Sequence, residues 1–365
     1  MSTVPNGSML RMARQLRGFQ QGEAANKLGV TQAALSRAEN GVVAPSDDLV
    51  AAAETCYRVP KSFFYQTDPV YGAPVSVHAM FRRKADVTAR ELDRIIAELN
   101  IRTIHLRKLL DSADFRASKE VPRLDVEKYK GDVEDIADVV RAHWQVPPGP
   151  IHNLTALAES AGIVVVHSDL GGAEVDGVKY EVPGLPPIVL LNSQKPADRM
   201  RFSLAHEIGH LVMHRLPNPE MEDQANLFAG AFLLPRREMK AAFSRKVDLR
   251  RLAELKPEWK VSMQALLYRA KTVGATNDNQ LRYLWQQFNI HRIRHREPPE
   301  LDFPTEQPIV LPRLLSLHLE DLGYTISTLA QALNWDADEM TAMYGIGTSG
   351  AKKKPVFRVI SNNGS

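Results

Sequence analysis

Two histidines and a glutamate in the run His206-Glu207-Ile208-Gly209-His210 have the spacing of a metal site. Side chains four residues apart lie on the same side of a helix, so both imidazole rings can bind one ion. Glu207 can reach a water molecule on that ion and act as its base. Zinc peptidases use this spacing. The sequence therefore predicts a helix that carries two zinc ligands and the catalytic base.

The third zinc ligand is expected among the residues that follow. A catalytic zinc takes three protein ligands and keeps one position open for water. His214 lies another four residues along the same helix, about 6 Å further up its axis, which is too far to close a tetrahedron with His206. We expect His214 to be a helix-end residue that contacts the last carbonyl groups. The candidates for the third ligand are His214, Glu220, Glu222 and Asp223.

Glu222 is the best of these candidates. It begins the run EDQANLFAGAFLLP and shares a helix face with Ala225 and Ala229, so small side chains would let this helix approach the first one closely. The two other acidic candidates point elsewhere on that helix or precede its start. Asn226 lies one turn beyond Glu222 and could hydrogen-bond a ligand histidine from behind.

Short strands are expected before the motif helix and should support it. The runs 163–166 and 187–191 are β-branched and aliphatic, and 178–182 alternates in a way that suits a third strand. The motif helix, 198–215, follows directly, and helices dominate after it. We expect the strand at 187–192 to offer its edge to an extended substrate, which main-chain hydrogen bonds would hold.

The residues also imply a mechanism for peptide cleavage. Zinc polarises the scissile carbonyl and acidifies its water. Glu207 would accept the proton of that water and pass it to the leaving amine. The sequence does not identify the donor that stabilises the oxyanion. The candidates are His167, His214 and Tyr180.

The N-terminal segment has the pattern of a DNA-binding helix-turn-helix. Apolar residues recur at helical spacing through 8–28, Gly29-Val30 forms a turn, and Thr31 caps a helix that ends at Asn40. In this geometry the second helix enters the major groove, and its first residues meet the base edges. The predicted contact residues are Gln32, Ala33, Ser36 and Arg37.

Other basic or polar groups could add to DNA binding. Gln21, at the start of the preceding helix, is placed to bind a phosphate. The basic run 81–84 could do the same, although a solvated linker is the simpler interpretation. The segment's excess of basic residues is small, so affinity could need a dimer, and the long helix expected at 86–110 could pair with a second copy. The alternative is a helical bundle that serves only protein contact.

The run FQQGEAANKLGVTQAALSRAENG resembles the Cro/phage-repressor (Xre-type) family, and the resemblance covers residues 9–65. It implies a five-helix DNA-binding domain in which Arg14 and Glu39 form an interior ion pair. Gly22 departs from the pattern and costs its helix about 1 kcal/mol relative to alanine.

The run RFSLAHEIGHLVMHR, followed by MEDQANLFAGAFLLPRREM, resembles the ImmA/IrrE family of metallopeptidases from about residue 155 to 275. By this resemblance His206, His210 and Glu222 bind zinc, and Glu207 is the catalytic base. The implied fold is a zincin-like core, in which a short sheet packs on the motif helix. The family includes proteins that cleave a repressor or antirepressor, and so switch on genes of mobile elements or stress responses.

The region after this core is expected to be helical. Residues 256–274 are similar to the helix-turn-helix that follows the core in this family, with Ser262 as the cap and Gln264 and Arg269 on the helix. A helical lid over the active site is an equally good interpretation. Residues 311–345 resemble the C-terminal helical extension of longer members, to which we assign no chemistry.

Composition bounds the rest of the prediction. The chain has 365 residues, a net charge of +3 and one cysteine, so no disulfide can form within it. It shows neither a signal peptide nor an apolar run of about 18 residues, which favours a cytoplasmic protein outside the membrane. We expect a mainly α fold with a small β-sheet (α+β). The expected domains are 1–68, DNA-binding; 69–150, linker and helical connector; 151–245, peptidase core; 246–346, helical C-terminal region; and 347–365, a disordered tail.

These observations predict a DNA-binding regulatory zinc endopeptidase, with one zinc ion per chain, that cleaves a repressor-like protein. Its partners would be operator DNA, the protein substrate and a second copy of the chain in a homodimer. Two alternatives stay open: a transcription regulator with a structural or vestigial metal site, and an antitoxin-like protein that neutralises a partner by contact. Glu207 favours the enzyme, because a structural zinc site needs no base.

Overall fold

The computed structural model describes residues 4–72, 88–170, 175–346 and 357–359. The basic run 81–84 and most of the tail from Gly347 lie outside these ranges. None of the helices in the described ranges is both long and apolar enough to cross a lipid bilayer. The fold is mainly helical with a small three-stranded mixed sheet, as the sequence predicts.

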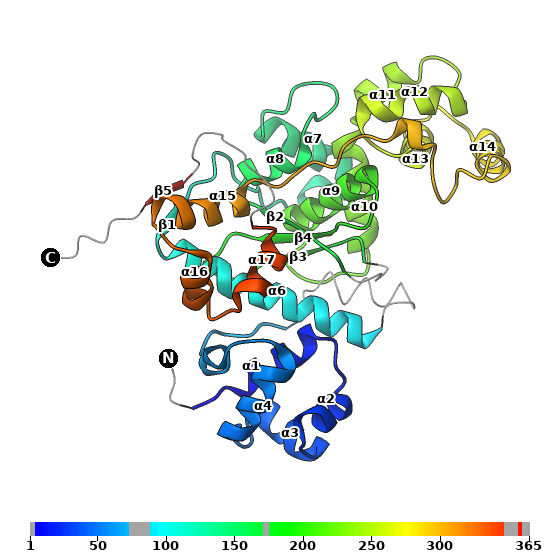
Figure 1. Ribbon diagram of the computed structural model, residues 1–365. Helices are drawn as coiled ribbons and strands as arrows, with labels where there is room; N and C mark the ends of the chain where they lie inside the picture. The colour runs from blue at the N-terminus through cyan, green and yellow to red at the C-terminus, as the bar shows by residue number, and fades with distance from the viewer. Residues whose placement is uncertain (1–3, 73–87, 171–174, 347–356, 360–365) are drawn as a thin grey trace.

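The N-terminal helices form the predicted helix-turn-helix, drawn in blue in Figure 1. Gly29 ends the first helix of the motif with a φ of 69°, and Thr31 Oγ1 caps the second helix by accepting the Ala34 N–H. The fifth expected helix is a short 3-10 helix. The elements are α1 (Gly7–Leu16), α2 (Gln21–Leu28), α3 (Gln32–Glu39), α4 (Asp47–Tyr57) and η1 (Lys61–Tyr65).

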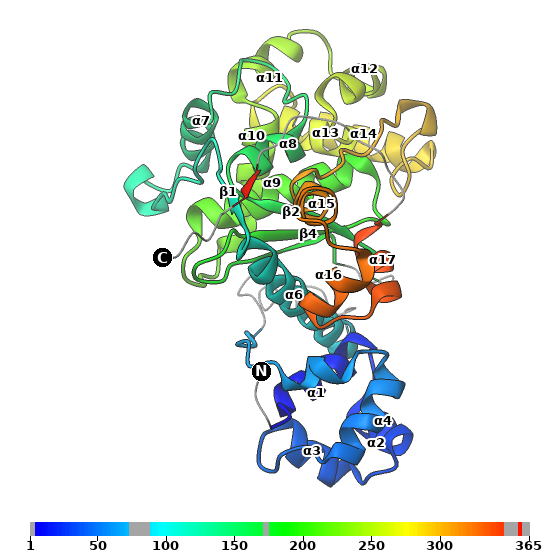
Figure 2. The ribbon, with the colours of Figure 1, turned by 60° about the vertical axis from the view of Figure 1, so that its left-hand side comes forward.

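A long helix, α6 (Ala89–Leu110), lies between the N-terminal helices and the sheet. Thr88 and Glu91 form a capping box that fixes its start. It packs against α1 on one side and beneath the sheet in Figure 2. Every residue from 97 to 106 is buried, so this stretch has no free face. The idea that the helix pairs with a second copy is therefore wrong for its buried half.

The sheet consists of β2 (Val164–Ser168), β3 (Gly177–Tyr180) and β4 (Ile188–Asn192), in the order β2-β4-β3. β4 pairs in parallel with β2 and antiparallel with β3. The expectation that 187–192 offers a free edge to substrate is therefore wrong, because β4 is hydrogen-bonded on both sides. The edge strands are β2 and β3.

Strand β4 separates two hydrophobic cores, because alternate side chains of a strand point to opposite faces. Ile188 and Leu190 belong to the core that contains α6 and the N-terminal helices. Val189 and Leu191 belong to the core built around α9 (Ala197–Met213). The motif helix α9 is thus held against one face of the sheet, and α6 against the other (Figure 2).

Helix α10 (Met221–Leu233) packs closely along α9. A Cβ atom at Gly209 would lie 3.0 Å from Phe228 Cδ1 of α10, which is tighter than nearly all Cβ contacts in proteins. Gly209 therefore permits the short distance between the two helices. α7 (Val133–His143) covers the outer side of α10, and α8 (Leu154–Ser160) packs on α9.

The C-terminal third is helical and divides into two groups. The first comprises α11 (Arg236–Ala242), α12 (Leu249–Trp259), α13 (Met263–Thr272) and α14 (Asp278–Ile290). The second comprises α15 (Val310–Ser316), α16 (Ile326–Leu333) and α17 (Ala337–Tyr344). The short elements are β1 (Ala113–Phe115), which pairs with β5 (Phe357–Val359), η2 (Val126–Tyr129), η3 (Pro299–Leu301) and η4 (Leu317–Asp321).

The second group returns to the N-terminal helices, as Figure 1 shows. Arg17 Nη1 lies 3.0 Å from Glu339 Oε2, and the Trp335 ring packs edge-on against Phe63 with centroids 5.4 Å apart. The helix-turn-helix therefore contacts both α6 and the C-terminal end of the described chain.

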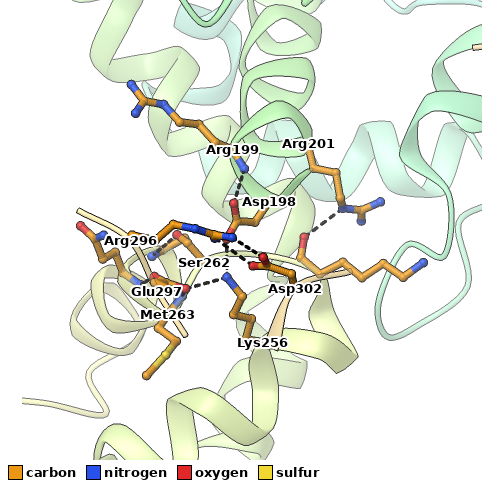
Figure 3. A network of polar contacts seen from close by, with 12 residues as sticks. Asp198, Arg199, Arg201, Lys256, Ser262, Met263, Arg296, Glu297 and Asp302 are labelled. Carbon is orange, nitrogen blue, oxygen red and sulfur yellow. Dashed lines mark hydrogen bonds and ion pairs between the residues drawn. The ribbon is translucent and has the colours of Figure 1, made fainter. Parts of the chain in front are cut away.

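A buried ionic cluster fixes the first turn of α9 (Figure 3). Lys256, at 0% exposure, donates to Asp198 Oδ2 over 2.5 Å and to Glu297 Oε2 over 2.8 Å. Glu297 Oε2 also accepts the Met263 N–H. Arg201, one turn further along α9, forms an ion pair with Glu306. These bonds attach the chain after α14 to the start of the motif helix.

Helix α13 does not present the DNA contacts considered for a second helix-turn-helix. Ser262 caps it as expected. Arg269, however, is only 4% exposed and forms an ion pair with Glu134, so its guanidinium cannot reach DNA. The Gln264 amide donates to the Arg294 carbonyl. The DNA-contact role considered for Arg269 is wrong, because its guanidinium is already paired with Glu134.

Candidate metal centre and DNA-binding face

His206 and His210 project from the same side of α9, and Glu222 faces them from the first turn of α10. The two Nε2 atoms are 3.0 Å apart. Glu222 Oε1 lies 3.3 Å from His210 Nε2, and Glu222 Oε2 lies 3.6 Å from His206 Nε2. The ligand atoms all lie within 4.8 Å of one another, close enough to bind one ion. The structure thus brings together the three residues named from the sequence as ligands.

The protonation of this cluster suits a cation. Glu222 Oε1 is buried and has no hydrogen-bond partner among the described residues. His206 Nδ1 lies 3.0 Å from Asn226 Oδ1, which can only accept, so the His206 proton is on Nδ1 and its Nε2 carries a lone pair. Two imidazole nitrogens and one carboxylate are a donor set that fits a divalent transition metal such as zinc.

The pKa values of the cluster agree with this arrangement. Burial lowers the pKa of His210 to about 4, so its ring is neutral near pH 7. Burial alone would lower the pKa of His206 as well, but the neighbouring Glu222 raises it above its usual value. Burial would raise the pKa of Glu222, but the two histidines bring it well below its usual range. A carboxylate and a neutral His210 ring are the forms that bind metal.

Glu207 lies on the side of α9 that faces β3. Its side chain is buried, and Oε2 accepts the Lys179 N–H of β3 over 3.0 Å. Burial raises the pKa of Glu207, although the charges of His206 and Lys179 oppose this rise. A raised pKa makes this carboxylate a stronger base than an exposed glutamate, which suits a group that takes up a proton. No local sequence pattern marks Lys179, because its role depends on how β3 meets α9.

The other acidic and histidine candidates lie outside the cluster. His214 ends α9, and its Nδ1 is 2.9 Å from His210 Nδ1, on the side of the ring away from Glu222. Its pKa is lowered by burial. It contacts a side chain, and not only the last carbonyl groups as expected. Glu220 immediately precedes α10, and Asp223 is an exposed residue of its first turn.

Two of the three suggested oxyanion donors are not placed near the base. The Tyr180 hydroxyl donates to Asn100 Oδ1 of α6 over 3.2 Å and belongs to the core on that side of the sheet. His167 is on β2, which β4 separates from the β3 strand that holds Glu207. Tyr180 is therefore corrected from a donor to an anchor of β3.

Helix α3 exposes the residues predicted to read DNA. Gln32, Ala33 and Arg37 are exposed and Ser36 is half-buried, whereas Leu35 is in the core. The Asn40 amide donates to Ser36 Oγ over 3.3 Å. The expected contacts thus share the solvent-facing side of one capped helix, and their role in binding bases stays a prediction.

The base of this face is an interior ion pair. Arg14 Nε and Nη2 donate to the two carboxylate oxygens of Glu39 over 2.6 and 2.9 Å, in the pair that the family resemblance implies. Gln21 Nε2 also donates to Glu39, over 3.0 Å. The structure places this amide against a buried carboxylate that needs hydrogen-bond donors, and the phosphate contact expected of Gln21 stays a prediction.

Two protein-family models match parts of this chain. Residues 158–271 match a peptidase-family model described as the IrrE N-terminal-like domain, and residues 10–64 match a helix-turn-helix model. A search of curated proteins found no match. The first range contains the metal cluster and Glu207, which suggests a metallopeptidase, and the second implies DNA binding. The chain therefore joins an Xre-type helix-turn-helix domain to an IrrE N-terminal-like peptidase domain.

Proposed function

We propose that this chain is a DNA-binding regulatory zinc endopeptidase. It cleaves a repressor-like protein and so switches gene expression in a stress response or in the control of a mobile element. The observation that carries the proposal is the convergence of His206, His210 and Glu222 beside the buried Glu207. A helix-turn-helix at the N-terminus gives the enzyme a place on DNA and argues against general digestion.

Zinc is the metal that we assign to the cluster, with one ion per chain. His206 Nε2, His210 Nε2 and one Glu222 oxygen would hold it and leave one position open. When bound, the ion would supply Lewis acidity toward a water molecule and toward the scissile carbonyl. Asn226 orients His206 by accepting its Nδ1 proton, which leaves Nε2 for the metal.

Glu207 would act as the base and then as the acid. Its Oε2 is held by the Lys179 N–H, so the carboxylate has a fixed direction. It takes the proton of the attacking water and gives it to the amine of the leaving half. Its raised pKa favours uptake of the proton, because burial destabilises the charged form of the carboxylate.

The substrate would lie along β3. Lys179 faces Val189 in the antiparallel ladder, yet its N–H goes to Glu207 and not to β4. In such a pair the carbonyl also turns outward, so the Lys179 carbonyl lies on the outer edge of β3 beside the base. A peptide added to this edge would be held by main-chain hydrogen bonds. A cavity of about 440 Å³ adjoins the end of β3, lined by Arg123, Glu181, Val182, Pro183, Leu185, Pro187 and Arg215.

The substrate can be sought among repressor-like proteins encoded beside the gene for this chain. Each is incubated with the zinc-loaded protein, and cleavage is followed by mass spectrometry. Cleavage at one site, lost on chelation and restored by zinc, supports the proposal. Intact partners that instead form a stable complex with the chain would point to an antitoxin-like binding protein.

DNA binding is tested separately, on the operator fragment that lies upstream of the same genes. Gln32→Ala and Arg37→Ala should each weaken binding by about 1–3 kcal/mol and relax sequence preference, as loss of a base contact does. Lys61→Ala is the matched control, because Lys61 is exposed on η1 and away from α3. Equal effects of all three changes would argue against base reading by α3.

A further inference from the structure

A chain of polar contacts leads from His210 away from the metal cluster. His210 Nδ1 lies 2.9 Å from His214 Nδ1, and His214 Nε2 lies 2.9 Å from Gln224 Oε1. Gln224 Nε2 then donates to Glu220 Oε2 over 3.3 Å. This chain of contacts begins on α9 and ends at Glu220, immediately before α10. It runs from a fully buried ring to an exposed carboxylate.

The direction of each proton in this chain follows from its last member. The Glu220 carboxylate can only accept, so the amide nitrogen of Gln224 faces it and the amide oxygen faces His214. That oxygen must accept a proton from His214 Nε2. A neutral imidazole with its proton on Nε2 has a lone pair on Nδ1.

The lone pair on His214 determines the tautomer of His210. Two ring nitrogens only 2.9 Å apart that do not face the proposed ion need one proton between them, and His214 Nδ1 has none to give. The Nε2 atoms of His206 and His210 differ in this respect, because the proposed ion would lie between them. His210 must therefore carry its proton on Nδ1, and its Nε2 is left bare, facing His206 and Glu222. Without this partner the proton could sit on either nitrogen, and on Nε2 it would occupy the ligand position.

We propose that His214 is a positioning residue for the metal, and that Gln224 and Glu220 set its tautomer. The inference rests on the proposed function, because it takes the cluster to be a metal site. The two ligand histidines are thus oriented by different means. Asn226 accepts the His206 proton directly, whereas the His210 proton is accepted by a second histidine that ends the same helix.

The decisive experiment measures zinc affinity by competition with a chromophoric chelator. His214→Leu removes the acceptor and should weaken zinc binding by about 10- to 100-fold, the range found when such a partner is lost. His214→Asn should largely restore the affinity, because its side-chain oxygen can take the place of Nδ1. Asp223→Asn is the control, since it removes a carboxylate from the first turn of α10 that is not part of the chain of contacts from His210 to Glu220. A His214→Leu protein that binds zinc as tightly as the wild type would overturn the proposal.

A second measurement follows the tautomer in the metal-free protein. Nitrogen-15 shifts of the His210 ring should show a protonated Nδ1 and a bare Nε2 in the wild type, and a mixture in His214→Leu and Gln224→Leu. A protonated Nε2 of His210 in the wild type would contradict the proposed role of His214. This measurement needs no metal, so it tests that role even if the wild type takes up no zinc. Failure to take up zinc would instead contradict the proposed function.

Discussion

Helix α9 carries two buried clusters of charged groups that differ in one respect. At its first turn Asp198 and Glu297 surround the ammonium group of Lys256 (Figure 3). Two turns later His206 and His210 face the carboxylate of Glu222. The chain provides the cation of the first cluster. In the second, the described residues include no lysine or arginine that pairs with Glu222.

The difference separates a structural cluster from a site. In the first cluster the carboxylates are also satisfied by backbone N–H groups, those of Arg199, Met263 and Gln264. In the second, Glu222 Oε1 is buried without a hydrogen-bond partner among the described residues. Leaving a buried carboxylate oxygen without a hydrogen bond is costly. A cluster that the fold leaves incomplete in this way is suited to a cation from solution, whereas a complete one contributes only to stability and position.

The largest effect is expected in the first cluster. Lys256→Met leaves two buried carboxylates without their cation and should lower the free energy of unfolding by about 3–5 kcal/mol. Chemical denaturation of the metal-free protein measures this change. Lys260→Met, on a half-buried neighbour whose ammonium group donates to the His152 carbonyl, is the control and should have a small effect. A loss of less than about 1 kcal/mol in the free energy of unfolding for Lys256→Met would show that the first cluster contributes little to stability.

Zinc should stabilise only a protein with an intact second cluster. At free zinc 100 times the dissociation constant, the wild type should gain about 2.7 kcal/mol in the free energy of unfolding. Glu222→Gln should gain almost nothing, because one of the three ligands is lost, while Asp223→Asn should behave as the wild type. Equal zinc-induced shifts of the thermal midpoint in all three proteins would place the metal elsewhere.

A smaller effect should follow pH. The pKa of His206 is raised, so protons compete for its Nε2 first, whereas the pKa of His210, about 4, keeps that ring available. Zinc affinity should therefore fall as pH drops below the raised pKa of His206, by about tenfold per pH unit for a single proton. The pKa of Lys256 is raised by its two carboxylates against the effect of burial, so the first cluster keeps its charges in this range. Affinity that stays constant from pH 8 to 5 would contradict this contrast.

The features predicted correctly from the sequence are those that depend on local spacing. A helical repeat of four places His206 beside His210, and the same periodicity on the next helix places Glu222 and Asn226 on one side. Caps and turns are equally local, which is why Thr31 and Ser262 begin helices as expected.

The features that were missed or wrong depend on how elements pack. Strand order is not periodic in sequence, so the pattern of residues 187–192 predicts a strand but does not reveal that β4 lies in the centre of the sheet. The position of Arg269 on its own helix suggests a DNA contact, but tertiary packing pairs its side chain with Glu134. Lys179 and Gln224 act through groups on other elements, and no local pattern marks them.

The central claim is that the incomplete cluster on α9 holds a zinc ion used for peptide cleavage. It is tested most directly by comparing the wild type with Glu207→Gln. Each protein is loaded with zinc and mixed with the intact repressor-like partner that the wild type cleaves. Glu207→Gln should bind one zinc per chain with unchanged affinity and cleave about 100- to 10,000-fold more slowly, as expected for loss of a general base. Cleavage at the wild-type rate by Glu207→Gln would contradict the account.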